Sequence, residues 1–299
     1  MWVRLAWIDH PSGKGEWCSS HLSLPFAIPI DGRTFKIFFS SRDSDQRSHI
    51  GSFDLDIASQ KVSVNTFCSL PLLSPGMIGS FDEHGVSGSY YSLSRHQLTI
   101  WNFGWKRLSG KAWINSIGIA KVPLGLNQTN VVNDLAFASN SNDTHGLAYP
   151  YITKINSKEM FFYASFDQYG IPSENEPYSF TAKSAEILKD FQLSSPTRMI
   201  NHMAGMSAQS RPCIIQDGNM YRAWVSVKGT EYEICSMVST DGINWNWDDS
   251  GNNLQAKGLG NEKEQVCYSH VVEHGRERFM FYNGDGFGMT GIGIAKWSE

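Results

Sequence analysis

Residues 279–283 read Phe-Met-Phe-Tyr-Asn, a short apolar and aromatic run that is entered from the turn residues His274-Gly275. Runs of this composition, bounded by turn signals, are typical of β-strands. The same pattern occurs four more times, in runs that begin at residues 36, 98, 160 and 220. The five starts are spaced by 62, 62, 60 and 59 residues. A period this regular indicates a repeat architecture.

Each repeat has a further strand before this run and another after it. Asp31-Gly32 and Asp217-Gly218 separate two of the preceding strands from the run, and Asp-Gly is a strong hairpin signal because type I′ turns need positive φ. The strands that follow carry apolar runs with glycine, as in residues 116–120. Helical periodicity is scarce, and only residues 182–191 look briefly helical.

Five antiparallel sheets joined in sequence predict an all-β fold, a five-bladed β-propeller. The strand expected at residues 2–7 belongs to no repeat. We expect this N-terminal strand to supply the outer strand of blade 5 and so complete the ring. One domain over residues 1–299 is predicted. A β-sandwich or two separate β-domains are the alternatives.

The composition excludes several classes of protein. The chain has 299 residues, of which 41% are hydrophobic and 13% aromatic, enough for a substantial core. The net charge of −4 rules out a strongly basic surface for nucleic acid or membranes. No apolar run approaches the roughly 20 residues of a membrane helix. The N-terminus lacks a signal-peptide pattern and the five cysteines are scattered, so we expect a cytoplasmic protein with reduced thiols.

The candidate site follows from the predicted topology. In a propeller the innermost strand of each blade lines the central channel, so residues near the start of these strands converge. The polar residues at these places are His21 in blade 1, Asp82 and Glu83 in blade 2, His145 in blade 3, Arg211 in blade 4, and Glu262, Glu264 and Tyr268 in blade 5. The glycine-rich loop at residues 283–288 is expected to bring Asn283 and Asp285 over the mouth of the channel.

Paired carboxylates in a polar site are what glycosidic bond cleavage needs, one protonated to donate to the leaving oxygen and one ionised. Each of these residues also has a structural interpretation. A carboxylate before a strand is often a turn former or a solvated charge. Arg42 and Arg47 are alternatively explained by pairing with Asp43 and Asp45 in the same hairpin, and Tyr149 and Tyr268 by packing.

Several further motifs occur together along nearly the whole chain. They are Ser20-His21 with Pro25, Ser40-Ser-Arg-Asp43 with Arg47, Phe81-Asp-Glu-His-Gly-Val86, Asn115-Ser-Ile-Gly-Ile-Ala120, Arg211-Pro212, Glu264 with Tyr268, and Phe281-Tyr-Asn-Gly-Asp-Gly-Phe-Gly288. Together they resemble the five-bladed propeller proteins related to glycoside hydrolase families 43 and 32 that occur in bacterial surface-polysaccharide gene clusters. The resemblance implies an axial pocket for a sugar or nucleotide-sugar in cytoplasmic glycan assembly. The residues it maps onto this pocket are His21, Arg42, Asp43, Arg47, Asp82, Arg211 and Glu264.

The chain departs from this family pattern at three places. The relatives usually carry a glutamate ahead of Arg211-Pro212, whereas residues 206–210 read Met-Ser-Ala-Gln-Ser. Asn261 stands where an aromatic residue is usual before Glu264, and Ser269 replaces a proline. The missing carboxylate in blade 4 bears directly on whether the site hydrolyses its ligand.

Two functions of the site therefore stay open. The first is an enzyme acting on a glycosidic or sugar-phosphate bond, with Asp82 as base, nucleophile or charge stabiliser and Glu264 as a partly buried proton donor. His21, His145 and Arg211 would then orient hydroxyls or neutralise an acidic group. The alternative is a non-catalytic module that binds a glycan or nucleotide-sugar. A propeller that binds another protein is a third possibility. For all three functions we expect no cofactor, no resident metal, and neither nucleic acid nor membrane as a partner.

Overall fold

The computed structural model covers residues 1–299 and describes all of them except 12, 59–60, 109–111, 124–130, 170–178 and 299. The strands form five antiparallel units, the blades, of four strands each. The strands of each blade are given below in order from the innermost to the outermost. Blade 1 contains β2 (Ser20–Asp31), β3 (Thr34–Arg42), β4 (Ser48–Ala58) and β5 (Lys61–Phe67). Blade 2 contains β6 (Gly85–Leu93), β7 (Gln97–Arg107), β8 (Trp113–Pro123) and β9 (Asn133–Phe137).

The other three blades repeat this order. Blade 3 contains β10 (Leu147–Ile155), β11 (Lys158–Phe166), β12 (Phe180–Glu186) and β13 (Thr197–Arg198). Blade 4 contains β14 (Ala208–Asp217), β15 (Met220–Lys228), β16 (Tyr232–Ser239) and β17 (Asn246–Trp247). Blade 5 contains β18 (Cys267–His274), β19 (Glu277–Asn283), β20 (Ile292–Trp297) and β1 (Trp2–Ile8). The predicted all-β, five-bladed propeller is confirmed.

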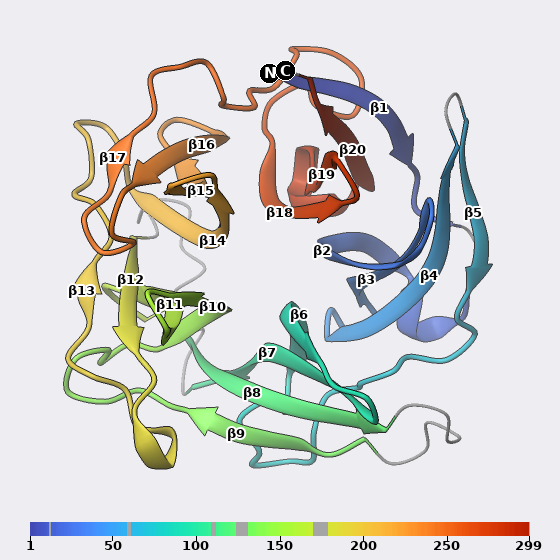
Figure 1. Cartoon of the computed structure of the whole chain (residues 1–299). Coiled ribbons are helices and arrows are strands. Elements are labelled where there is room, and N and C mark those ends of the chain that lie inside the picture. The colour runs from blue at the N-terminus through green and yellow to red at the C-terminus, as the bar shows by residue number, and fades with distance from the viewer. Residues whose placement is uncertain (12, 59–60, 109–111, 124–130, 170–178, 299) are drawn as a thin grey trace.

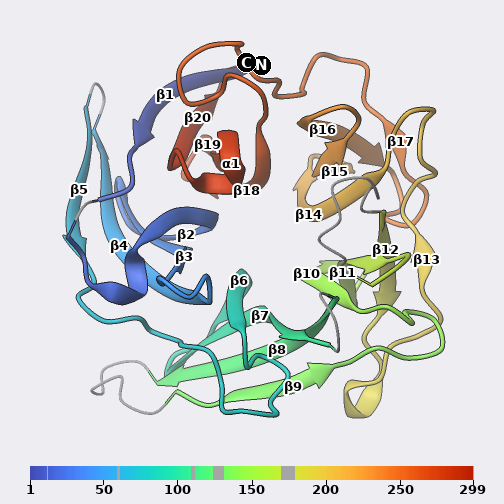
Figure 2. The same ribbon diagram turned by 180° about the vertical axis from the view of Figure 1, so that it is seen from behind.

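The five blades surround a common axis, and β2, β6, β10, β14 and β18 are the strands nearest to it (Figures 1 and 2). The ring is closed by the N-terminal strand, because β1 pairs with β20 from Trp2↔Trp297 to Ile8↔Ile292. The two ends of the chain lie together, and the N-terminal ammonium of Met1 donates to the carbonyl of Ser298 at 2.5 Å. The prediction that this strand completes blade 5 is therefore correct.

The glycines of the third strands have a steric explanation. In blade 1 a Cβ on Gly51 would lie 2.4 Å from the ring of Trp17, and in blade 2 a Cβ on Gly118 would lie 2.6 Å from the ring of Phe81. In both blades an aromatic residue from the segment before the innermost strand packs on the sheet where a side chain is missing. In these two blades the isoleucine-glycine pair thus marks where this segment crosses its sheet, whereas Gly293 of blade 5 packs against Tyr282 and Trp7.

The predicted helical stretch at residues 182–191 is wrong. Residues 180–186 form β12 and pair with β11 along its length, and only Lys189–Phe191 form a single 3-10 turn. The pairing with β11 buries Ala182 and Ala185, and this tertiary contact overrides the weak local preference for helix. In the part of the chain that the structure describes, no helix has the length and apolarity needed to cross a membrane.

Candidate functional site

Four of the five innermost strands share one backbone irregularity. The register slips around Leu24, Tyr149, Arg211 and Tyr268, and each of these residues has a left-handed φ between 50° and 58°. The next residue is proline in the first three and Ser269 in the fourth. Proline has no N–H for the ladder, so the strand bulges. A left-handed non-glycine residue costs about 1–3 kcal/mol, and such strain clusters at functional sites.

The bulge in blade 4 links three blades through Arg211. This side chain is only 2% exposed. Its Nη1 donates to the carbonyl of Tyr268 in blade 5 and its Nη2 to the carbonyl of Pro25 in blade 1, both at 2.6 Å. Burial lowers the pKa of Arg211 to about 10, which leaves the guanidinium charged at neutral pH. Arg211 therefore holds a positive charge at the inner edge of the ring.

The bulges of blades 3 and 5 bring two tyrosines together. The hydroxyls of Tyr149 and Tyr268 lie 3.3 Å apart and their rings stack with centroids 5.6 Å apart. Burial raises the pKa of Tyr149 to about 12 and that of Tyr268 well above its usual value, so both phenols are neutral hydrogen-bond donors. Tyr268 stays half-buried and also contacts the ring of Phe287, at 6.0 Å between centroids.

Arg42, the last residue of β3, lies near enough to this tyrosine pair for its charge to act on both rings. Its charge interacts with the phenols of both tyrosines. Burial lowers the pKa of Arg42, and the two phenols partly offset this effect. The guanidinium is half-buried, and the one hydrogen bond it forms with the residues that the structure describes is a long one of 3.4 Å from Nη1 to Gln46. No carboxylate pairs with Arg42 among the described residues, so the alternative that it pairs with Asp43 or Asp45 is wrong.

His21 completes the group at the start of β2. It is 5% exposed, has a left-handed φ of 68°, and its Nδ1 lies 2.9 Å from the hydroxyl of Ser20. Burial, with a smaller effect from the charge of Arg42, lowers the pKa of His21 to about 4, so the ring is neutral at pH 7. We call the five residues His21, Arg42, Tyr149, Arg211 and Tyr268 the axial cluster.

The predicted carboxylates do not join the axial cluster. Asp82 is buried, and its carboxylate accepts hydrogen bonds at 2.8 Å from Ser80 and from Asn133 on the outer strand β9. Its Cβ lies against Gly104 of β7. The carboxylate therefore points outward along blade 2, and the predicted position at the channel mouth is wrong.

Glu262 and Asp43 are likewise used within their own blades. Glu262 accepts from Arg4 of the outer strand β1 at 2.6 Å and from the hydroxyl of Tyr282 at 2.5 Å. Asp43 accepts from the side chain of Arg47 at 2.9 Å, as the hairpin interpretation of Arg47 predicted, and lies 3.1 Å from Nε2 of His49. Both carboxylates are buried. They stabilise the blades rather than facing the axis.

Glu264 and Glu83 lie in loops before the innermost strands. The side chain of Glu264 is exposed, so the partial burial expected of a proton donor is not found. Its backbone is nevertheless fixed, because the carboxylate of Asp285 accepts hydrogen bonds at 2.8–3.0 Å from the amides of residues 263–265. Glu83 accepts from the amide of Gly79 at 2.9 Å, within its own loop.

Asn283 does not face the mouth but ties blade 5 to blade 1. It is fully buried, and its Nδ2 donates to the carbonyls of Leu22 and Gly291 at 2.7 and 2.8 Å. Its Oδ1 accepts from the amide of Leu24 at 2.7 Å. Asn283 therefore supports the bulge of blade 1.

His145 is half-buried and contacts Thr144, at 3.0 Å, and the ring of Tyr169. Among the described residues, no group of three or more His, Cys, Asp or Glu side chains is arranged to hold a metal ion. A cavity of about 700 Å³ lies between blades 2 and 3, lined by aromatic residues such as Trp101 and Phe191. None of the predicted site residues lines this cavity.

Comparison with known proteins places the chain in a family. No protein-family model matches it. The uncharacterized protein MT1551 of Mycobacterium tuberculosis (strain CDC 1551 / Oshkosh) is 30% identical over 295 residues, which are 98% of each chain. The chain belongs to the MT1551 family. The uncharacterized protein Rv1502 of M. tuberculosis (strain ATCC 25618 / H37Rv) is 29% identical over 295 residues, again 98% of each chain.

Solved structures show which fold this member of the MT1551 family has. A glycoside hydrolase superposes with a TM-score of 0.71 at 13% identity, covering 99% of this chain and 91% of its own. A thermostable family-43 glycoside hydrolase gives a TM-score of 0.67 at 11% identity, covering 92% and 88%. An α-L-arabinofuranosidase from Lactobacillus brevis gives 0.67 at 9%, covering 93% and 91%. The glycosidase-like propeller fold implied by the sequence resemblance is confirmed.

One member of the axial cluster was assigned by sequence only to packing. Tyr149 lies in the bulge of blade 3 in the same place as Arg211 in blade 4 and Tyr268 in blade 5. The signal that would have found it is the repeated proline inside a strand otherwise expected to be central, at Pro25, Pro150 and Pro212. A proline in a central strand marks a bulge, and a bulge redirects a side chain.

Proposed function

We propose that this MT1551-family propeller is a carbohydrate-binding protein and that its axial cluster holds a sugar. The observation that carries the proposal is the set of neutral donors and aromatic rings held on strained bulges at the axis: His21, Tyr149 and Tyr268. Phenol and imidazole groups donate to and accept from sugar hydroxyls, and ligand sites combine aromatic surfaces with a few placed polar groups. The likeness to glycoside hydrolase folds supports the same class of ligand by analogy.

The positions of the carboxylates favour a binding function over a hydrolytic one. Glycoside hydrolysis needs two carboxyl groups flanking the bond. Asp82, Glu262 and Asp43 accept hydrogen bonds from neighbouring side chains inside their blades, which leaves them poorly placed for a substrate at the axis. The missing glutamate ahead of Arg211 supports the same conclusion.

One observation favours an enzyme as the second candidate. Asp285 fixes the loop of Glu264 through three backbone amides, while the carboxylate of Glu264 forms no hydrogen bond among the described residues. An exposed carboxyl group on a fixed loop could act on a glycosidic or sugar-phosphate bond once a ligand covers it. A role in cytoplasmic assembly of surface polysaccharides is proposed from the sequence resemblance for either function.

The test monitors by NMR the binding of sugars, sugar phosphates and nucleotide-sugars to the protein. A separate assay looks for products formed from the same compounds. We expect binding in the wild type, weakened by His21→Ala and by Tyr149→Phe. The matched control is His96→Ala, because His96 is exposed in a turn of blade 2. Binding that is equal in all variants would contradict the proposal. Product formation that Glu264→Gln abolishes, with binding retained, would establish the enzyme instead.

A further inference from the structure

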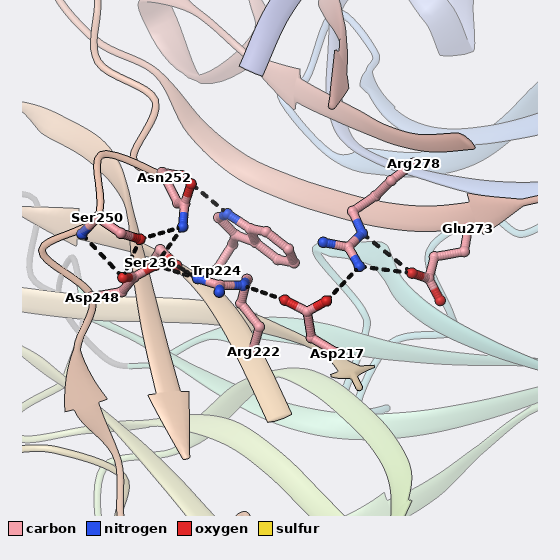
Figure 3. Close-up of polar contacts among 9 residues, drawn as sticks. All are labelled: Asp217, Arg222, Trp224, Ser236, Asp248, Ser250, Asn252, Glu273 and Arg278. Atoms are coloured by element: carbon pink, nitrogen blue, oxygen red, sulfur yellow. Dashed lines mark hydrogen bonds and ion pairs between the residues drawn. The ribbon is translucent and has the colours of Figure 1, made fainter. Parts of the chain in front are cut away.

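Apart from Arg42 and Arg211, the buried and half-buried arginines in the described part of the chain are paired with carboxylates, and Figure 3 shows two of them, Arg222 and Arg278. Arg222 donates to Asp217 at 2.8 Å and also pairs with Asp248, while Arg278 reaches Asp217 and Glu273 at 3.0 and 2.9 Å. Two further pairs, Arg4 with Glu262 and Lys183 with Asp143, follow the same rule. A charge removed from water is costly unless it is compensated, and these pairs supply the compensation.

The two arginines of the axial cluster depart from this rule. Neither Arg42 nor Arg211 forms an ion pair in the described ranges, although Arg211 is 2% exposed and Arg42 is half-buried. The tyrosines and the histidine that interact with these arginines are neutral: burial raises the pKa values of Tyr149 and Tyr268, and burial also lowers the pKa of His270 to about 3. The chain as a whole carries a net charge of −4, so the excess of positive charge here is local.

The two guanidinium groups differ in what they can offer a ligand. Arg211 already uses Nη1 and Nη2 on backbone carbonyls, so it contributes mainly its charge. Within the described residues, the side chain of Arg42 forms only the long hydrogen bond to Gln46, which leaves most of its donors available there. Arginine binds phosphate and carboxylate groups through two parallel hydrogen bonds. The charges of Arg42 and of Arg211 both act on the phenols of Tyr149 and Tyr268. Two positive charges that serve one site match a phosphate dianion better than a single carboxylate.

Building on the proposed sugar site, we infer that the ligand of the axial cluster is a phosphate-bearing sugar and that Arg42 binds its phosphate. The paired hydroxyls of Tyr149 and Tyr268, on which the charge of Arg42 acts, serve as further neutral donors. Arg42 thereby determines the specificity of the site for an anionic over a neutral sugar.

The test is calorimetric titration of the full chain with inorganic phosphate, glucose, glucose 1-phosphate, UDP-glucose and glucuronate. We expect inorganic phosphate to bind, and a sugar phosphate to bind at least tenfold more tightly than the neutral sugar. Arg42→Gln should weaken phosphate binding about tenfold to hundredfold, as for loss of a charge-assisted contact. Arg42→Lys, which retains the charge, should lose less. Arg33→Gln makes the same charge change at an exposed turn residue and should leave affinity within about twofold.

The outcomes separate the two proposals. If neutral sugar binds and phosphate adds nothing, or if a folded Arg42→Gln protein binds phosphate normally, the inference about Arg42 is wrong while the sugar site stands. If inorganic phosphate binds through Arg42 but no sugar adds affinity, the anion site stands and the sugar proposal fails. Glucuronate binding as tightly as glucose 1-phosphate would overturn the choice of phosphate. A preference for UDP-glucose over glucose 1-phosphate would identify a nucleotide-sugar as the source of the phosphate.

Discussion

Asn283 links blade 5 to blade 1, and replacing it with alanine should destabilise the whole protein. Its side chain satisfies three buried backbone groups, the carbonyls of Leu22 and Gly291 and the amide of Leu24. An unsatisfied buried polar group costs about 1–3 kcal/mol, and partial relaxation reduces the sum. We therefore expect Asn283→Ala to lower the free energy of unfolding by about 3–5 kcal/mol, a large part of the stability of an ordinary protein.

The assay is equilibrium unfolding in urea, followed by tryptophan fluorescence and circular dichroism. Asn283→Asp keeps the acceptor for Leu24 but loses both donors, so it should also destabilise the protein. The control is Asn142→Ala, because Asn142 is exposed and uses only its backbone atoms in hydrogen bonds among the described residues. An Asn283→Ala protein within about 1 kcal/mol of wild type would show that this link between blades 5 and 1 is dispensable.

Three further predictions concern groups whose surroundings the structure defines. Asp82→Ala should lower the free energy of unfolding by about 1–3 kcal/mol, because Asn133 and Ser80 lose their acceptor. Ligand binding should persist in this variant, and a folded Asp82→Ala protein that no longer binds ligand would restore Asp82 to the site. NMR titration of His21 should give a midpoint near pH 4, because burial disfavours the charged ring. The contribution of His21 to the free energy of unfolding should therefore fall as the pH drops from about 6.5 towards 4. A midpoint at pH 6 or above would contradict this prediction. Burial alone would raise the pKa of Asp248, but hydrogen bonds from Ser250, Asn252 and Ser236 hold it well below its usual value. The stability lost in Asp248→Asn should therefore be largest at neutral pH and shrink as the pH falls below about 4, and a loss independent of pH would refute the assignment.

The sequence predicted the fold well because the information is local and repeated. Each blade carries its own aromatic strand and turn signals, so the period of about 60 residues was visible without any long-range contact. The pairing of β1 with β20 followed because one strand was left over from the repeat. His21, Arg211 and Tyr268 were placed near the axis by the same topology.

The carboxylates were misplaced because their partners are distant in sequence. Asp82 bonds to a residue 51 positions away, and Glu262 to one 258 positions away. The sequence showed that these residues precede an innermost strand but not whether they point inward or along the blade. The outward direction is set by the amide of Asn133 and the guanidinium of Arg4, which no spacing rule connects to them.

The most direct test is a crystal structure of the protein with its tightest-binding sugar phosphate. We predict a phosphate oxygen about 3 Å from the guanidinium of Arg42, with the sugar against Tyr149 and Tyr268. A ligand bound instead in the cavity of about 700 Å³ between blades 2 and 3, beside Trp101 and away from the axial cluster, would contradict it.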